Sequence, residues 1–324
     1  MHTCQYWLND QSTLLKEYKD LLQTNLQLSK CTATCSMGSC FATEIRQRLI
    51  LEGYNYLLGE QGKQLWIRDE RWGSPLQHSS VAWERVYSTH TFLHIVEYTF
   101  GTRSFDRLHT CEFNYRERKH IPVVTDLLRS KIFYSDREAA EKDVLDHNHA
   151  SRVVLEQADL LILTLGLTEV WWSDRGFFLS QYPHVYTLDG VSFVVSDYQE
   201  NLDNLNQAYA ILKEHNPKLK ILVTVSPVHL DATFRTDVDI FTASCASKSI
   251  LRTVADTFVS SHEDAYYFPS YEIATMIAPR LQIPIWRSFS STFFRSLDLR
   301  HISPEVIDLI MSIFNGMYLG RGGS

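Results

Sequence analysis

Short apolar runs alternate with amphipathic segments along most of this chain. The densest run covers 159–165 (Asp-Leu-Leu-Ile-Leu-Thr-Leu) and is followed by Gly166. A second run, Lys-Ile-Leu-Val-Thr-Val at 220–225, ends at Ser226-Pro227. Apolar runs of this length are typical of strands that are buried on both faces of a parallel sheet. We therefore predict central strands at both places, and shorter strands at 32–35, 54–58 and 265–268.

Between these runs, apolar residues recur at the three- and four-residue spacing of helices. Ser303-Pro304 adds an N-cap and a proline at the first helical position. The pattern predicts helices at 11–28, from Glu44 onwards, at 83–100, around 149–157, at 201–215, at 246–258 and after Ser303. Alternating strands and helices indicate an α/β fold, in which helices cover both faces of a central parallel sheet.

Two stretches interrupt this alternation. The stretch at about 59–145 begins with a polar part that contains glycine and continues with charges and aromatic residues of no clear period. The stretch at 170–196 holds many aromatic residues around Asp189-Gly190, a hairpin signal. We expect one domain over 1–319, with these two stretches inserted as a cap over the site, and a flexible tail at 320–324.

Composition narrows the class of protein. The chain has 324 residues, of which 44% are hydrophobic, so it can bury a large core. Its formal net charge of -7, without a run of Lys and Arg, argues against a nucleic-acid partner. No run reaches the roughly 18 apolar residues of a membrane span, and no signal peptide is visible. Six cysteines form no disulfide framework at this length, so we expect a reduced, cytoplasmic setting.

A thiol lies where a predicted strand turns into a predicted helix, in Gly38-Ser39-Cys40-Phe41-Ala42. Unpaired backbone N–H groups and the positive end of a helix dipole favour the thiolate, which is the nucleophilic form. The same N–H groups can receive the oxyanion that forms in acyl transfer. The alternative interpretation is a buried structural cysteine beside a turn glycine.

The sequence carries no common signature of a metal or nucleotide site. The spacing of Cys31, Cys35 and Cys40 fits no common zinc pattern, so we expect no metal site. A redox pair between Cys35 and Cys40 stays open. Neither a P-loop nor a dinucleotide-binding fingerprint occurs, which argues against nucleotide chemistry. We expect no tightly bound cofactor, and an acyl thioester is compatible as a co-substrate.

The cysteine motif resembles the signature of the GSCFA family, which groups with the SGNH (GDSL-like) hydrolases. Further segments that resemble the family follow in the expected order: Leu165-Gly166-Leu167-Thr168-Glu169-Val170-Trp171, Ser226-Pro227-Val228-His229-Leu230, Phe268-Pro269-Ser270-Tyr271-Glu272 and Asp298-Leu299-Arg300-His301. The resemblance spans Gly38 to His301 and implies a three-layer α/β/α domain of SGNH type.

A thiol nucleophile needs a base within hydrogen-bond reach and a carboxylate that orients this base. Asp298 and His301 can supply both. Two other Asp-x-x-His pairs occur, at Asp106/His109 and Asp146/His149. We favour the last pair because it lies beyond the final predicted strand, on a loop directly before an N-cap. The pair also matches the place where the SGNH family, which the chain resembles, keeps its Asp and His.

The sequence offers alternatives for the nucleophile and for the oxyanion donors. The resemblance aligns Cys40 with the family's nucleophile, and Ser39 is the alternative nucleophile or a hydroxyl satisfied within the turn. Thr168 falls where the superfamily usually has an asparagine and can donate one hydroxyl instead. Glu169 either binds substrate or pairs with an arginine, and His229 either contacts substrate or is structural. Ser88 and Thr89 are candidates for a second oxyanion donor.

These residues predict a cysteine-dependent acyl-transfer enzyme that acts on a thioester or ester through an acyl-Cys40 intermediate. Its partners are a small-molecule acyl donor, for which a coenzyme A or carrier-protein thioester is compatible, and an alcohol, an amine or water as acceptor. One alternative is an esterase or deacetylase that uses Ser39. Another is a catalytically inactive SGNH-like binding protein, which the missing asparagine at Thr168 suggests.

Overall fold

The structure is a computed structural model, which describes residues 11–22, 24–60, 80–83, 85–113, 121–129, 132–182, 186–290 and 295–318. Within these ranges the backbones of Cys40 and Asp298 are described, and their side chains lie outside the description. The predicted tail at 320–324 and residues 61–79 of the first predicted insertion also lie outside it.

The helices follow in chain order as α1 (Gln11–Leu21), α2 (Cys40–Leu51), α3 (Thr89–Phe100), α4 (Arg137–Gln157), α5 (Tyr198–His215), α6 (Ile240–Ser261), α7 (Ser270–Glu272), α8 (Ala278–Arg280) and α9 (Pro304–Tyr318). A π-helical turn at Ile273–Ile277 joins α7 to α8. The strands are β1 (Thr34–Gly38), β2 (Leu108–Phe113), β3 (Ile121–Asp126), β4 (Phe133–Tyr134), β5 (Leu160–Leu165), β6 (Glu169–Ser173), β7 (Phe177–Phe178), β8 (Val191–Val195), β9 (Lys220–Val225), β10 (Ala265–Tyr267), β11 (Trp286–Ser290) and β12 (Arg295–Ile302).

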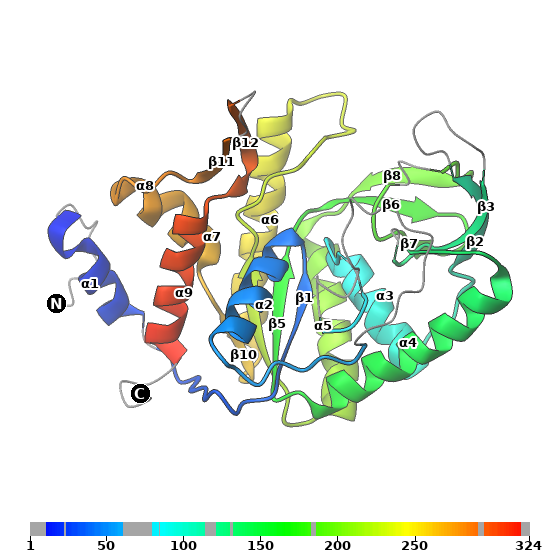
Figure 1. The fold of residues 1–324 in the computed structure, drawn as a ribbon, viewed down its shortest axis with the longest axis horizontal. Helices are drawn as coiled ribbons and strands as arrows, with labels where there is room; N and C mark the ends of the chain where they lie inside the picture. The colour runs from blue at the N-terminus through cyan, green and yellow to red at the C-terminus, as the bar shows by residue number, and fades with distance from the viewer. Residues whose placement is uncertain are drawn as a thin grey trace.

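The central sheet has the order β1-β5-β9-β10, and all its pairings are parallel. Its strands are apolar because helices cover both faces. Leu161, Leu163 and Leu165 of β5 belong to the core with α3, α4, α5 and α6, whereas Leu160 and Ile162 belong to the core with α2 and α9. Figure 1 shows α1 and α9 on one side of the sheet and α3 and α4 on the other. The predicted α/β fold with a central parallel sheet is confirmed.

Helices follow β1 and β5 on opposite faces of the sheet. α2, which continues from β1, packs into the core of α9, and α5, the next helix after β5, packs into the core of α3 and α6. After two neighbouring parallel strands, the chain thus turns to opposite faces of the sheet. The place where this happens is called a topological switch point, and open α/β sheets bind their ligands there. The carboxyl ends of β1 and β5 are therefore the place to look for a site.

Two antiparallel sheets lie in the stretches where the sequence shows no strand–helix alternation. One has the order β2-β3-β4 and the other β7-β6-β8. They pack together through Phe105 and Phe177, whose ring centroids lie 4.4 Å apart, and through the N–H of Ser180, which donates to the carbonyl of Leu127. Both sheets lie beside α4 at the right of Figure 1.

Several predicted boundaries are wrong for physical reasons. The strand expected at 54–58 is reduced to one bridge, between Tyr56 and Thr34. The helix expected at 83–100 begins only at Thr89, where Ser88 caps it, and the N–H of Val86 before it donates to the carbonyl of Gly38. The helix expected at 11–28 ends at Leu21. The one expected around 149–157 extends back to Arg137, where Asp136 caps it.

A buried ion network holds the β2-β3-β4 sheet to α4. Arg107 donates two hydrogen bonds to the carboxylate of Asp126, and Arg129 donates to both Asp126 and Asp143. Burial alone would raise the pKa of Asp126, but the two guanidinium groups hold it below its usual range. Tyr134 donates its hydroxyl proton to Asp143 at 2.5 Å. Removing one member would leave a buried charge without its partner.

β1 approaches β5 closely at Gly38, which pairs with Thr164. Gly38 has a φ of +153°, and a Cβ built on it would lie 2.5 Å from the Cβ of Thr164 and 2.8 Å from its carbonyl oxygen. A side chain of any size is therefore excluded where β1 ends and α2 begins.

We expect Gly38→Ala to lower the free energy of unfolding by about 1–3 kcal/mol, because the added methyl group overlaps the backbone of β5. Urea denaturation measures this value. Gly316→Ala is the matched control, since Gly316 lies in α9 with open space around it. There alanine should stabilise the helix by up to about 1 kcal/mol. An equal response of both variants would contradict the close approach.

Candidate active site

The turn from β1 into α2 is built around Ser39. Its side-chain oxygen accepts a hydrogen bond from the N–H of Phe41 at 3.4 Å, and its hydroxyl donates to Ser226 at 3.2 Å. Ser39 is thus the N-cap of α2 and is 4% exposed. Cys40 is the first helical residue, so its backbone lies at the positive end of this helix dipole. These contacts agree with the interpretation of Ser39 as a hydroxyl satisfied within the turn.

The chain that leads into α3 passes between the ends of β1 and β5. The N–H groups of Gly166 and Leu167 both donate to the carbonyl of Tyr87 at 3.0 Å. A Cβ on Gly166 would lie 2.7 Å from this carbonyl oxygen, so the approach requires glycine. The N-terminus of α3 therefore lies next to that of α2. Ser88 caps α3, and the hydroxyl of Thr89 donates to Asn201 at 2.8 Å.

One face of α6 holds the loops that follow β5 and β9. We call Ser244, Ser247 and Lys248 the α6 polar face. Ser247 accepts from the N–H of Thr168 at 2.8 Å, and the ammonium of Lys248 donates to the carbonyl of Gly166 at 2.6 Å. Ser244 hydrogen-bonds His229 at 3.0 Å. Lys248 is 2% exposed, so a buried positive charge lies beside the switch point. This face could not be recognised from the sequence, because serines at helical spacing carry no signal of their own.

Thr168 is buried, and its main chain is used within the protein. Its carbonyl accepts from both the N–H and the hydroxyl of Ser196, at 2.8 and 3.0 Å. The side chain of Asn201 in turn donates to the Ser196 hydroxyl at 2.8 Å. Neither main-chain group of Thr168 is therefore available to an oxyanion. Only its side chain can take the role that the sequence predicts.

β11 and β12 form a two-stranded antiparallel sheet, which we call the β11–β12 ribbon. His229 joins the loop after β9 to this ribbon. Its ring is half-buried and lies 5.0 Å from the ring of Trp286, measured between centroids. Burial, and then the positive charge of Lys248, lower the pKa of His229. Trp286 pairs with Ile302, which directly follows His301. This chain of contacts brings the ribbon that carries His301 to the carboxyl edge of the central sheet.

The prediction that Asp298 and His301 lie on a loop is wrong, because both are in β12. Arg287 of β11 pairs with Asp298 of β12, and the preceding Trp286 pairs with Ile302. Residues 299–301 of β12 therefore lie opposite the single peptide bond that joins Trp286 to Arg287. This is a β-bulge, and bulges redirect side chains next to active sites. In a regular strand, residues three apart face opposite sides, and the bulge between Asp298 and His301 breaks that alternation. The sequence gives no sign of it.

The backbones of Cys40 and His301 border the same hydrophobic cluster. Phe41, which follows Cys40, and Ile302, which follows His301, are both in the core beneath α9 together with Val228 of the loop after β9. Three segments that are distant in the sequence therefore contribute to one hydrophobic core, on the face of the sheet that α2 and α9 cover. The positions of the Cys40 sulfur and the Asp298 carboxylate lie outside the described side chains. His301 is half-buried.

The neighbouring thiols differ in exposure. Cys35 is fully buried in β1, and burial raises the pKa of its thiol, so it is a poor nucleophile. Cys31 and Cys245 are exposed. Within the described ranges, no three His, Cys, Asp or Glu side chains gather where they could hold a metal ion. None of the helices described is long and apolar enough to cross a membrane.

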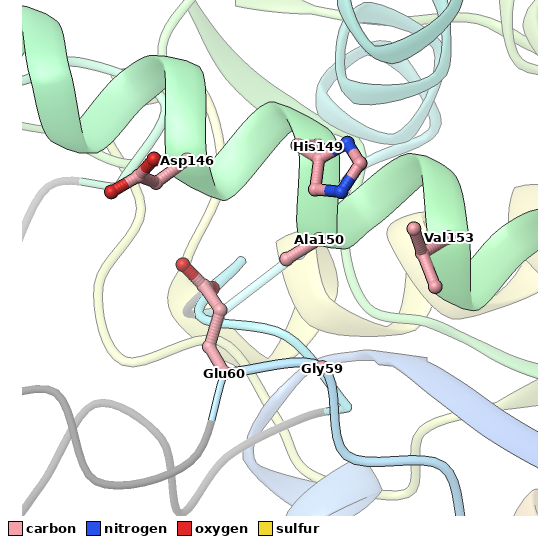
Figure 2. A pocket seen from close by; sticks show the side chains of 6 residues that line it. All are labelled: Gly59, Glu60, Asp146, His149, Ala150 and Val153. Carbon is pink, nitrogen blue, oxygen red and sulfur yellow. The ribbon is translucent and has the colours of Figure 1, made fainter.

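A pocket also lies against α4, away from this edge. Figure 2 shows Asp146, His149, Ala150 and Val153 on α4, and Gly59 and Glu60 on the facing chain. Glu60 is buried and accepts from His147 at 2.9 Å, and burial lowers the pKa of His147 to about 4. The facing chain follows the parallel bridge between Tyr56 and Thr34, and this chain and α4 together line the pocket. It includes none of the predicted site residues.

We expect Lys248→Met to raise the pKa of His229 toward its ordinary value, because a positive charge that disfavours the imidazolium is removed. Burial, the larger cause, remains. NMR titration of the His229 ring measures the effect. Lys213→Met is the control, since the Lys213 ammonium binds Asp264 and the carbonyl of Leu219, at the amino end of β9. An unchanged pKa of His229 in Lys248→Met would show that this lysine does not act on the ring.

Comparisons with known proteins identify the family. No curated protein matches the chain. Among solved structures, it is similar to a carbohydrate esterase family 2 enzyme with a carbohydrate binding domain from Corynascus thermopiles (Myceliophthora fergusii). The identity is 15% and the TM-score 0.25, over 49% of this chain and 37% of that chain, which supports no conclusion about activity. The GSCFA family matches over residues 33–314, from β1 into α9. This protein belongs to the GSCFA family.

Proposed function

We propose that this protein is an acyl-transfer enzyme of SGNH type that uses Cys40 as its nucleophile. The observation that carries the proposal is the place of Cys40, the first residue of a twelve-residue helix that begins at the switch point between β1 and β5. A thiol at a helix N-terminus is stabilised as the thiolate by the dipole and by nearby N–H groups. The switch point is also where an α/β sheet admits a ligand.

Further positive charge at this edge favours the same chemistry. The N-terminus of α3 adjoins that of α2, and the buried ammonium of Lys248 lies at the carbonyl of Gly166. Groups fixed in this way stabilise a thiolate before attack and an oxyanion during it. Ser39 already uses the N–H groups of Phe41 and Ala42. We therefore assign the N–H of Cys40 to the oxyanion, with the Thr168 hydroxyl as a second donor.

The reaction proceeds in two balanced steps. The Cys40 thiolate attacks the carbonyl carbon of a thioester or ester, so that an S–C bond forms and the donor's C–S or C–O bond breaks. The leaving group takes a proton from the ring of His301, which Asp298 orients. In the second step an alcohol, an amine or water attacks the acyl-Cys40 and gives its proton to His301, and the thiolate leaves.

The contacts of Ser39 favour Cys40 as the nucleophile. The Ser39 hydroxyl caps α2 and donates to Ser226, and the residue is 4% exposed. An attacking serine needs a base at its hydroxyl, and a cap that is bonded to another hydroxyl offers no such contact. Ser39 therefore supports the turn that positions Cys40.

We expect wild-type protein to gain the mass of one acyl group when it is incubated with short acyl thioesters or p-nitrophenyl esters. Cys40→Ala should lose this adduct, together with about a thousandfold or more of the turnover, because the covalent step is removed. Intact-mass spectrometry measures the adduct. Cys245→Ala is the matched control, since Cys245 is an exposed thiol on the same chain, and it should keep both.

Two other results would replace the proposal. An adduct that persists in Cys40→Ala and disappears in Ser39→Ala would make the protein a serine esterase or deacetylase. Tight binding of an ester without any adduct or turnover would make it an inactive binding protein.

A further inference from the structure

A buried carboxylate near the switch point has one oxygen that no described residue binds. Glu169 is the first residue of β6, three positions after Gly166, and is 8% exposed. Its Oε1 accepts from the hydroxyl of Thr233 at 2.8 Å. Its Oε2 is buried and has no hydrogen-bond partner among the described residues. Buried polar atoms are almost always paired in folded proteins, so an unpaired carboxylate oxygen calls for an explanation.

Among the described residues, the carboxylate of Glu169 also has no direct counter-ion. No described lysine, arginine or histidine side chain forms an ion pair with it. Arg235 is close enough to be influenced by this charge, but its guanidinium binds Asp237 at 2.9 Å. A buried carboxylate is stabilised when a cation with hydrogen-bond donors reaches it. A cation that carries hydrogen-bond donors is therefore the group that fits this oxygen best.

Four aromatic rings pack beside this carboxylate. We call Trp171, Tyr182, Phe193 and Phe234 the aromatic cluster, in which the centroid of the Trp171 ring lies 4.3 Å from Tyr182 and 4.7 Å from Phe234. Trp171 is two residues after Glu169 on β6 and so shares its face of the sheet. Phe234 directly follows Thr233, the residue that binds Glu169. The ring faces attract cations and pack against apolar stems.

The outer edge of the aromatic cluster is accessible. Phe234 is 42% exposed, in the segment 226–239, which contains neither helix nor strand. A change of its side-chain rotamer can admit a ligand toward Glu169. Three residues of extended chain span roughly 10 Å. A ligand there therefore adjoins Gly166 and the proposed active site.

We propose that Glu169 and the aromatic cluster form the substrate subsite, and that this substrate carries a protonated amine on an apolar stem. The ammonium binds Oε2 of Glu169, and the stem packs on the aromatic cluster. This assignment rests on the proposed function in one respect, which is that the bound molecule is the acyl donor or the acceptor. The ammonium is a recognition group, and the acyl chemistry takes place elsewhere on the same molecule.

The test compares two ligands that differ only in charge, butylammonium chloride and 1-butanol, by isothermal titration or NMR without any acyl donor. We expect wild-type protein to bind butylammonium about tenfold or more tightly than butanol, as charge-assisted hydrogen bonds do. Glu169→Gln, which keeps the shape but removes the charge, should abolish this preference. Glu272→Gln is the matched control, because Glu272 is already paired with Arg252 and Tyr267, and it should keep the preference.

The wild-type protein alone can overturn the proposal. It would do so if it bound the two ligands with equal affinity or bound neither. A preference that survives in Glu169→Gln would place the cation elsewhere and would also overturn it. Failure here is separate from failure of the proposed function, because acylation of Cys40 is measured with neutral thioesters and binding is measured without them.

Discussion

The contact between the ends of β1 and β5 fixes everything else at this edge of the molecule. At Gly38 the two backbones are so close that no side chain fits beside Thr164. The chain must then turn at once, and Ser39 caps the helix that begins there. After the neighbouring strand β5, Gly166 is equally close to the carbonyl of Tyr87, so a side chain does not fit there either. Because both approaches require glycine, the N-termini of α2 and α3 are held side by side at the switch point.

Charge follows from this geometry. Two helix N-termini and the buried ammonium of Lys248 make the edge favourable for an anion, whether thiolate or oxyanion. The α6 polar face holds the loops after β5 and β9 in place, and burial together with the charge of its lysine lowers the pKa of the neighbouring His229. The buried carboxylate of Glu169 lies beyond the loop after β5 and accepts from Thr233, which directly precedes Phe234 of the aromatic cluster. The buried cation thus lies at Gly166 and the buried carboxylate three residues further along the chain, where we place the subsite for the substrate's amine.

Much of this arrangement could be predicted from the sequence. The apolar runs at β5 and β9 appear with their correct positions, because strands buried on both faces leave a continuous signal. The N-cap at Ser303 and the cysteine at a strand–helix junction are also local signals. The β-bulge in β12 is not, since it depends on pairing between strands. The role of Lys248 is hidden for the same reason: its partner, Gly166, is 82 residues away.

The central claim is that the start of α2 at the switch point activates the thiol of Cys40, and the rate of its alkylation tests this most directly. Pulse labelling of the native protein with iodoacetamide at neutral pH, followed by peptide mass spectrometry, compares Cys40 with the exposed thiols Cys31 and Cys245. The account predicts that Cys40 reacts at least about tenfold faster than either, because more of it is thiolate. A Cys40 that reacts no faster than these two thiols would contradict the account.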